Sequence, residues 1–233
     1  MKHLSQFKPV FIFIVSLGWL LILGTVIFSP DTIIELGHNI AQKDMLTDYI
    51  KGLAWFFVLG VTIFFWPVEK ENKKALFAAW LVKGLVVLGF MLFYESHYGL
   101  DAFMYFDEAV NRPSMFNGFR FGESGTSNMI GLTILQQKII PNSYHAAKVT
   151  CAFIGLIAIY LFYRAVVIFM RKEIIGIFYL IALWPSNLFW SSILGKDPIV
   201  FLGICMYIYG VMGWYRNLKI KYILILAAGI LVA

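Results

Sequence analysis

The sequence contains few charged residues for its length. Only 14% of its 233 residues are Asp, Glu, Lys or Arg, and 61% are hydrophobic. Soluble domains average about 25% charged and about 45–50% apolar residues. A soluble globule of this size cannot bury so much apolar surface, whereas a bilayer accommodates it as helices of ~20 apolar residues. The composition therefore excludes an ordinary soluble protein and predicts an integral membrane protein without a soluble domain that could fold alone.

Cysteine is almost absent, with only two residues in the chain. Cys151 and Cys205 each lie inside an apolar run, so we expect small buried hydrophobes rather than a disulfide or a metal pair. The formal net charge of +6 could suit nucleic acid. However, the basic residues form short clusters at the ends of apolar runs, as membrane topology requires. The sequence thus predicts contact with membrane lipid and no nucleic-acid partner.

Seven apolar runs divide the chain. They cover residues 10–28, 52–68, 75–93, 146–170, 174–190, 198–214 and 222–233. The first six are long enough to cross a bilayer, and the last is too short to do so. Pro185 is expected to bend or end the fifth run, because proline lacks an amide hydrogen and clashes with the preceding turn. The pattern predicts an all-α, polytopic transmembrane helical bundle of about six to seven spans. It forms a single transmembrane domain over residues 1–233, which we expect to be truncated at its C-terminus.

Lys and Arg gather in every second connection between the apolar runs, starting with the residues before the first run. All acidic residues except Glu69, Glu71 and Glu173 lie in the alternate connections. Because cytoplasmic connections are rich in Lys and Arg, we expect a multi-pass protein of the bacterial inner membrane with a cytoplasmic N-terminus. The alternate connections, including the large segment 95–144, are then expected to face outward (periplasmic).

Acidic residues open this large outer segment. If residues 100–110 are helical, Asp101, Tyr105 and Glu108 share one face, and Asp107 lies beside that stripe. Carboxylates at a membrane surface are candidates for a general base. The alternative is an ordinary solvated helix with Asp101 as its N-cap.

Basic side chains are expected near the same membrane face. Lys196 and Asp197 begin the sixth run, where a lysine can reach a lipid phosphate; alternatively, Lys196 anchors at the interface and Asp197 caps the helix. Lys148, one turn into the fourth run, either joins Lys196 around an anion or snorkels. Arg120 either meets a phosphate or is a solvated loop residue. Lys83 lies near the middle of the third run, where an ionisable residue suggests a function unless its stem reaches the inner interface.

The chain resembles polytopic glycosyltransferases of the GT-C fold class, which take sugars from polyprenyl-phosphate carriers as the protein mannosyltransferase relatives do. The resemblance depends on three segments within residues 95–210. The first is Asp101-x-x-x-Tyr105-x-x-x-Ala109, and the second is Gly125-Thr126, followed by a short predicted helix over 129–140 and a span ending Tyr163-Arg164-Ala165. The third is Trp184-Pro-Ser-Asn-Leu-Phe-Trp-Ser-Ser, followed by Gly195-Lys-Asp-Pro198. In one respect the chain departs from the family pattern. The acidic loop typically follows the first span, whereas here it follows the third.

The resemblance implies an inverting hexosyltransferase with its site on the outer face. The implied donor is a polyprenyl-phosphate-linked sugar, and the acceptor is a glycan, a lipid or a protein. The implied catalytic residues are Asp101, with Asp107 and Glu108, and the implied substrate-binding residues are Tyr105, Arg120, Lys148, Lys196 and Asp197. The sequence identifies no certain cofactor: a divalent metal is compatible with Asp107 and Glu108, but no ligand spacing demands one.

Three alternatives stay open at this level. A lipid-linked oligosaccharide polymerase or ligase shares an outer site but favours an arginine-rich outer loop, and here only Arg112 and Arg120 are present. A transporter or flippase predicts charged residues within the spans and related halves, and only Lys83 fits. A non-catalytic subunit needs no general base at Asp101.

Overall fold

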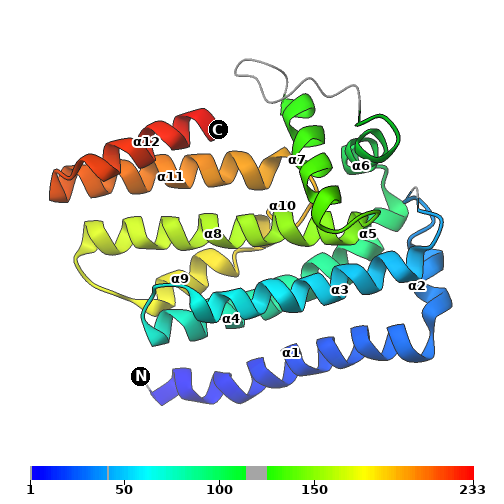
Figure 1. Cartoon of the computed structure of the whole chain (residues 1–233). Coiled ribbons are helices and arrows are strands. Elements are labelled where there is room, and N and C mark those ends of the chain that lie inside the picture. The colour runs from blue at the N-terminus through cyan, green and yellow to red at the C-terminus, as the bar shows by residue number, and fades with distance from the viewer. Residues whose placement is uncertain (1, 41, 114–124) are drawn as a thin grey trace.

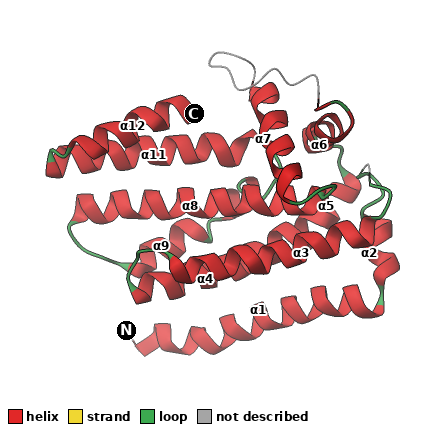
Figure 2. Cartoon of the chain, viewed as in Figure 1, coloured by secondary structure: helices red, strands yellow, loops and turns green. Residues whose placement is uncertain are grey.

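The structure is a computed structural model, and it describes residues 2–40, 42–113 and 125–233, with side chains from residue 9 onward. Within these residues the regular structure is helical and no strand is present (Figure 2). The predicted all-α helical bundle is therefore confirmed.

The helices follow one another along the chain as α1 (Lys2–Phe28), α2 (Pro30–Leu36), α3 (Met45–Thr62), η1 (Ile63–Phe65), α4 (Lys70–Gly84), η2 (Leu85–Phe90), α5 (Met91–His97), α6 (Asp101–Asn111), α7 (Gly125–Ile139), α8 (Tyr144–Met170), α9 (Ile175–Ala182), α10 (Pro185–Trp190), α11 (Lys196–Asn217) and α12 (Ile220–Val232).

Five helical stretches of the described chain are long and apolar enough to cross a bilayer. They are Pro9–Phe28, Met45–Phe65, Lys70–His97, Tyr144–Met170 and Lys196–Asn217. The sequence predicted six, and the difference lies in residues 174–190. This run is split into α9 and α10, because Pro185 starts a new helix at its first turn. The prediction that Pro185 would bend or end the run is confirmed.

The second span begins earlier than its apolar run. Helix α3 starts at Met45 rather than at residue 52, because Asp44 caps it: the side chain accepts a hydrogen bond of 3.0 Å from the amide of Thr47. This places the polar residue Asp48 inside the first turn of a membrane helix, where it is buried. Capping, rather than hydrophobicity, therefore sets this end of the span.

The long helices lie side by side, with α8 between α3 and α11, and with α12 folded back along α11 (Figure 1). Helix α1 lies at the opposite side of the bundle from α12. Helices α6 and α7 pack against each other over one end of the bundle, where α8 and α11 begin. The described helices of the segment 95–144, α6 and α7, therefore form a cap on that end.

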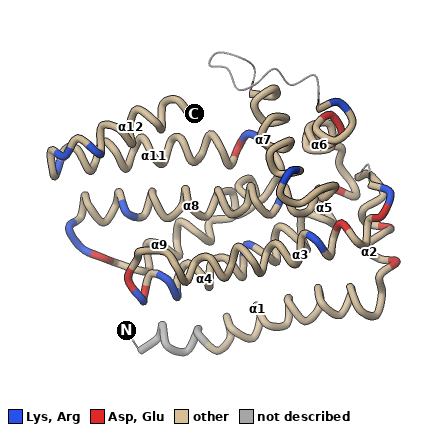
Figure 3. The backbone as a smooth tube through the Cα atoms, in the orientation of Figure 1, with Lys and Arg blue, Asp and Glu red and all other residues tan. Residues whose placement is uncertain are grey.

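Charged residues gather mainly at the two ends of the bundle, and the middle of the long helices is largely uncharged (Figure 3). The connections that follow η1, α8 and α11 lie at the end opposite α6 and α7, and they carry many of the Lys and Arg residues. Large hydrophobic side chains such as Phe13, Leu20, Phe65 and Leu224 are exposed on the sides. The chain is a helical membrane protein whose apolar sides suit lipid.

The third span contains a π-helical stretch, η2, directly after Lys83 and Gly84. Two carbonyl groups of this span accept hydrogen bonds from other helices: Tyr49 Oη donates to the oxygen of Leu88 (2.8 Å) and Trp19 Nε1 to that of Leu81 (3.1 Å). Stretches of π-helix occur frequently at functional sites. Tyr49 of α3 bonds to a carbonyl within η2, and Val87 and Leu88 are buried, as expected for irregular backbone at membrane depth.

Candidate functional site

Three elements meet around Tyr105 at the capped end of the bundle. Asp101 lies in the first turn of α6 and is exposed, and Tyr105, one turn later, is buried. The Tyr105 hydroxyl donates to Asp101 Oδ2 at 3.5 Å. Lys196 Nζ, from the start of α11, lies 5.9 Å from the centroid of the Tyr105 ring, within the range of a cation–π interaction. Asp101, Tyr105 and Lys196 thus form one cluster from residues far apart in the sequence.

The beginning of α7 completes this cluster. A Cβ atom at Gly125 would lie only 3.2 Å from Cδ of Lys196, so the lysine stem passes directly over the glycine. Helix α6 agrees with the predicted helix over 100–110, and α7 begins four residues before the predicted start at 129. The absence of a side chain at Gly125 therefore lets the ammonium group of Lys196 reach Tyr105.

The other two predicted carboxylates are bonded along their own helix. Asn111 Nδ2 donates to Asp107 Oδ1 at 2.7 Å, and Glu108 Oε1 lies 3.8 Å from the guanidinium of Arg112. Among the residues that the structure describes, neither bonds to Tyr105 or Lys196, so Asp101 is the carboxylate that the fold associates with the cluster. Arg120 lies outside the described residues.

Lys148 has a different environment from the one predicted. Its side chain is fully buried, and Nζ lies 2.6 Å from Glu95 Oε2, while the Tyr144 hydroxyl donates to Glu95 Oε1 at 2.8 Å. The alternative that Lys148 snorkels is wrong, because the lysine pairs with Glu95 inside the protein. The substrate-binding role assigned to it has no support here, since the ammonium group is already engaged. Sequence reasoning missed Glu95, whose only signal is its place directly after an apolar run.

A second buried polar cluster joins the starts of α3 and α8. Asp48 Oδ1 accepts from Ser143 Oγ (2.6 Å), and Asp48 Oδ2 lies 2.8 Å from Nδ1 of His145. Ser143 bonds to the carboxylate rather than to the imidazole, so the three residues do not form a nucleophilic triad, in which the serine bonds to histidine. Sequence reasoning missed this cluster, because its members are single residues in separate segments with no recognisable spacing.

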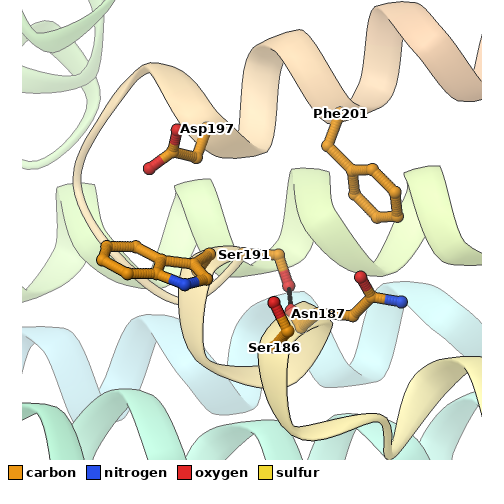
Figure 4. Close-up of a pocket in the computed structure, with 6 residues that line it drawn as sticks. Ser186, Asn187, Ser191, Asp197 and Phe201 are labelled. Carbon is orange, nitrogen blue, oxygen red and sulfur yellow. Dashed lines mark hydrogen bonds between the residues drawn. The ribbon is translucent and has the colours of Figure 1, made fainter.

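A cavity of about 410 Å³ lies between α10 and the start of α11 (Figure 4). Its lining residues are Ser186, Asn187, Trp190, Ser191, Asp197 and Phe201. Asp197 and Phe201 come from α11, and the other residues come from α10 and the position after it. The predicted binding residue Asp197 therefore faces a cavity of its own, beside the cluster that contains Lys196.

Lys83 lies behind this cavity. It is fully buried, and its Nζ donates to Ser191 Oγ at 2.5 Å; Ser191 Oγ in turn donates to the carbonyl oxygen of Asn187. Lys83 therefore does not reach the inner interface. The sequence marked Lys83 as unusual but contained no signal for its partner.

Among the residues that the structure describes, no three His, Cys, Asp or Glu side chains lie close enough together to hold a metal ion. Cys151 and Cys205 are both buried and unpaired by a disulfide, as the sequence predicted. The described cluster around Tyr105 brings together a carboxylate, a phenol and a lysine.

Comparison with known proteins adds no relative to this picture. No protein-family model matches the chain, and no curated protein and no solved structure matches it.

Proposed function

We propose that this protein is a membrane glycosyltransferase that moves a sugar from a polyprenyl-phosphate carrier to an acceptor hydroxyl at the outer face of the membrane. Support comes from the cluster around Tyr105. There a carboxylate from α6 and a lysine from α11 approach the same tyrosine at one end of a membrane bundle. Displacement of a lipid phosphate by a hydroxyl needs a base on one side and a cation on the other.

Asp101 is the general base in this proposal. It takes the proton of the acceptor hydroxyl as the acceptor oxygen bonds to the anomeric carbon of the sugar. The bond between that carbon and the phosphate oxygen breaks in the same displacement, so the configuration inverts. Asp101 suits this role because its side chain is exposed at the end of the bundle, where an acceptor has access. The Tyr105 hydroxyl restricts its orientation.

Lys196 stabilises the departing lipid phosphate. Its ammonium group lies over the Tyr105 ring, and its stem packs across Gly125. Among the described residues, Lys196 has no carboxylate within ion-pair distance. A cation that is fixed before the reaction stabilises the charge that develops on the leaving group. Lys196 therefore differs from Lys148, whose charge is paired with the carboxylate of Glu95.

The test is transfer by the purified full chain in liposomes. Undecaprenyl phosphate carrying radiolabelled mannose, glucose or galactose serves as the donor in separate reactions, and membranes from cells that lack the protein supply the acceptor. Asp101→Asn should lower the initial rate by ~10²–10⁴-fold, the usual contribution of a positioned base. Its thermal unfolding should match that of the wild type, since the side chain is exposed.

Asp31→Asn is the matched control, because Asp31 is an exposed aspartate in the first turn of another helix, α2. It should transfer sugar at the wild-type rate. Full transfer by Asp101→Asn would exclude the general-base role, as expected for a non-catalytic subunit. Failure of the wild type with all three donors would count against the enzyme class itself.

A further inference from the structure

Two lysines of the membrane bundle are fully buried, and they differ in their partners. Lys148 lies 2.6 Å from the carboxylate of Glu95. Lys83 has no carboxylate within ion-pair distance among the described residues, and its only hydrogen bond there is to Ser191 Oγ. A buried charge without a counter-ion is costly, and at membrane depth it indicates a function. In its charged form, Lys83 therefore needs a negative partner that the described residues do not supply.

The hydrogen bonds around Ser191 show which group donates and which accepts. Ser191 donates its own proton to the carbonyl of Asn187, so it accepts from Lys83, which is the donor. The order is opposite to that of a nucleophilic serine, which would donate to a neutral lysine base. Ser191 also lines the cavity between α10 and α11. The ammonium group of Lys83 is thus separated from the cavity by the hydroxyl group of Ser191.

The close approach of Ser191 depends on a glycine in α8. A Cβ at Gly155 would lie 2.6 Å from Cβ of Ser191 and 2.8 Å from its carbonyl oxygen. Directly after Lys83 and Gly84 the third span becomes π-helical, a feature typical of functional sites. A glycine in α8 thus makes room for Ser191, and irregular backbone directly follows Lys83.

The cavity offers groups that suit a phosphate and a hydroxylated headgroup. Ser186 presents a hydroxyl donor to the cavity, and Asn187 presents the amide N–H that does not bond to the carbonyl of Ile181. These donors, with the charge of Lys83 behind Ser191, match a tetrahedral anion with a single negative charge. Asp197, from the α11 side, lines the same cavity. Because a carboxylate only accepts hydrogen bonds, the ligand must bring hydroxyl groups to it and keep its anionic group near Ser191.

The surroundings of the cavity suit a lipid. Trp190 and Phe201 contribute aromatic surface to its wall, and Trp190 is half exposed. Leu180 and Trp184, just before α10, are also exposed apolar side chains. An acyl or prenyl chain can lie along this surface while its headgroup enters the cavity.

From these observations we infer that the cavity between α10 and α11 binds the phosphodiester of a membrane lipid with a hydroxylated headgroup, and that Lys83 supplies the counter-charge through Ser191. The inference does not depend on the transfer reaction, because an ordinary phospholipid such as phosphatidylglycerol has the required chemistry. A polyprenyl-phosphate-linked sugar has the same chemistry, so the experiment separates the two.

The test uses the full chain, purified in a maltoside detergent and freed of lipid. Native mass spectrometry and thermal unfolding measure the binding of phosphatidylglycerol, phosphatidylcholine, diacylglycerol, undecaprenyl-phosphate-linked glucose and inorganic phosphate. We expect phosphatidylglycerol or the prenyl-linked glucose to bind and to raise Tm. The lipids that lack a hydroxylated headgroup or a phosphate should bind at least about ten-fold more weakly. Whichever of the two expected ligands binds more tightly identifies the source of the phosphate.

Variants separate binding from a structural role. Lys83→Met should weaken binding of the preferred lipid by at least about ten-fold and abolish its effect on Tm, while the lipid-free Tm is unchanged or higher, since a buried charge has been removed. Lys138→Met removes the same charge from the exposed last turn of α7 and should bind like the wild type. Ser191→Ala should reproduce the loss if Lys83→Met does not fold.

Three results would overturn the inference. The first is lipid-dependent stabilisation that persists in Lys83→Met or Ser191→Ala. The second is binding of inorganic phosphate or phosphatidylcholine as tight as that of both expected lipids. The third is covalent labelling of Ser191 by a fluorophosphonate, which would make Lys83 a base and Ser191 a nucleophile.

Discussion

Lys148 and Glu95 form an ion pair with an Nζ–Oε2 distance of 2.6 Å, and both side chains are fully buried. The pair joins α8 to α5, and Tyr144 adds a hydrogen bond to the second carboxylate oxygen. Removing one partner of a buried pair leaves an uncompensated charge, which costs about 3–5 kcal/mol. The pair therefore holds the capped end of the bundle together as long as both partners are present.

Glu95→Leu and Lys148→Leu should each lower the stability of the bundle by about 3–5 kcal/mol, and the double variant should recover most of that loss. Thermal unfolding in detergent measures the three variants against the wild type. Lys74→Ala is the control, because its ion pair with Glu71 is exposed and such pairs contribute about 0–1 kcal/mol. Additive losses in the double variant would show that the two residues do not act as a pair.

Gly155→Ala should disturb the Lys83–Ser191 contact. The new methyl group would lie 2.6 Å from Cβ of Ser191, and overpacking of this kind costs about 1–3 kcal/mol. We expect a lower Tm together with weaker binding of phosphatidylglycerol. Gly24→Ala in α1 meets nothing within 4 Å and should leave Tm unchanged or raise it slightly, since alanine favours helix. Equal behaviour of the two variants would contradict the packing described for Ser191.

Asp48→Ala should destabilise the junction of α3 and α8. It would leave His145 Nδ1 and the amide of His145 without their acceptor and Ser143 Oγ with only the backbone carbonyl of residue 48 at 3.4 Å. Each buried unpaired group costs about 1–3 kcal/mol. Asp48→Asn keeps one side-chain carbonyl oxygen as an acceptor and should therefore lose less stability than Asp48→Ala. Thermal unfolding provides the measurement, and the exposed Asp31→Ala should shift Tm little. A wild-type Tm for Asp48→Ala would mean that these bonds do not stabilise the junction.

Lys196→Gln should slow sugar transfer by ~10²–10³-fold in kcat if the lysine stabilises the leaving phosphate. Lys196→Arg keeps the charge and should retain part of the rate. Initial rates in the liposome assay measure both variants, with Lys138→Gln as an exposed control. A change in KM alone, with kcat intact, would assign Lys196 to ground-state binding instead.

Local patterns were sufficient for much of the fold. Five of the apolar runs correspond to helices long enough to span a bilayer. The periodicity around Asp101 predicted α6, and Pro185 marked the break before α10. The start of α3 was predicted too late, because its cap at Asp44 extends the helix beyond the apolar run. The cluster around Tyr105 was anticipated in part, since Lys196 and Asp101 were expected at the same face and both contact Tyr105.

The partners of the buried polar residues followed from no local pattern. Lys148 and Glu95 are 53 positions apart, and Lys83 and Ser191 are 108 positions apart. Nothing in the sequence near either lysine distinguishes the one with a carboxylate partner from the other, since both lie within an apolar run.

The sequence by itself determined that the chain enters a membrane as a bundle of helices, because the length of an apolar run and the chemistry of proline act locally. Only the tertiary structure decided which of the buried lysines has a carboxylate partner and which has none among the described residues. The physical reason is that the cost of a buried charge depends on groups within a few ångströms, and helix packing brings those groups from distant parts of the chain.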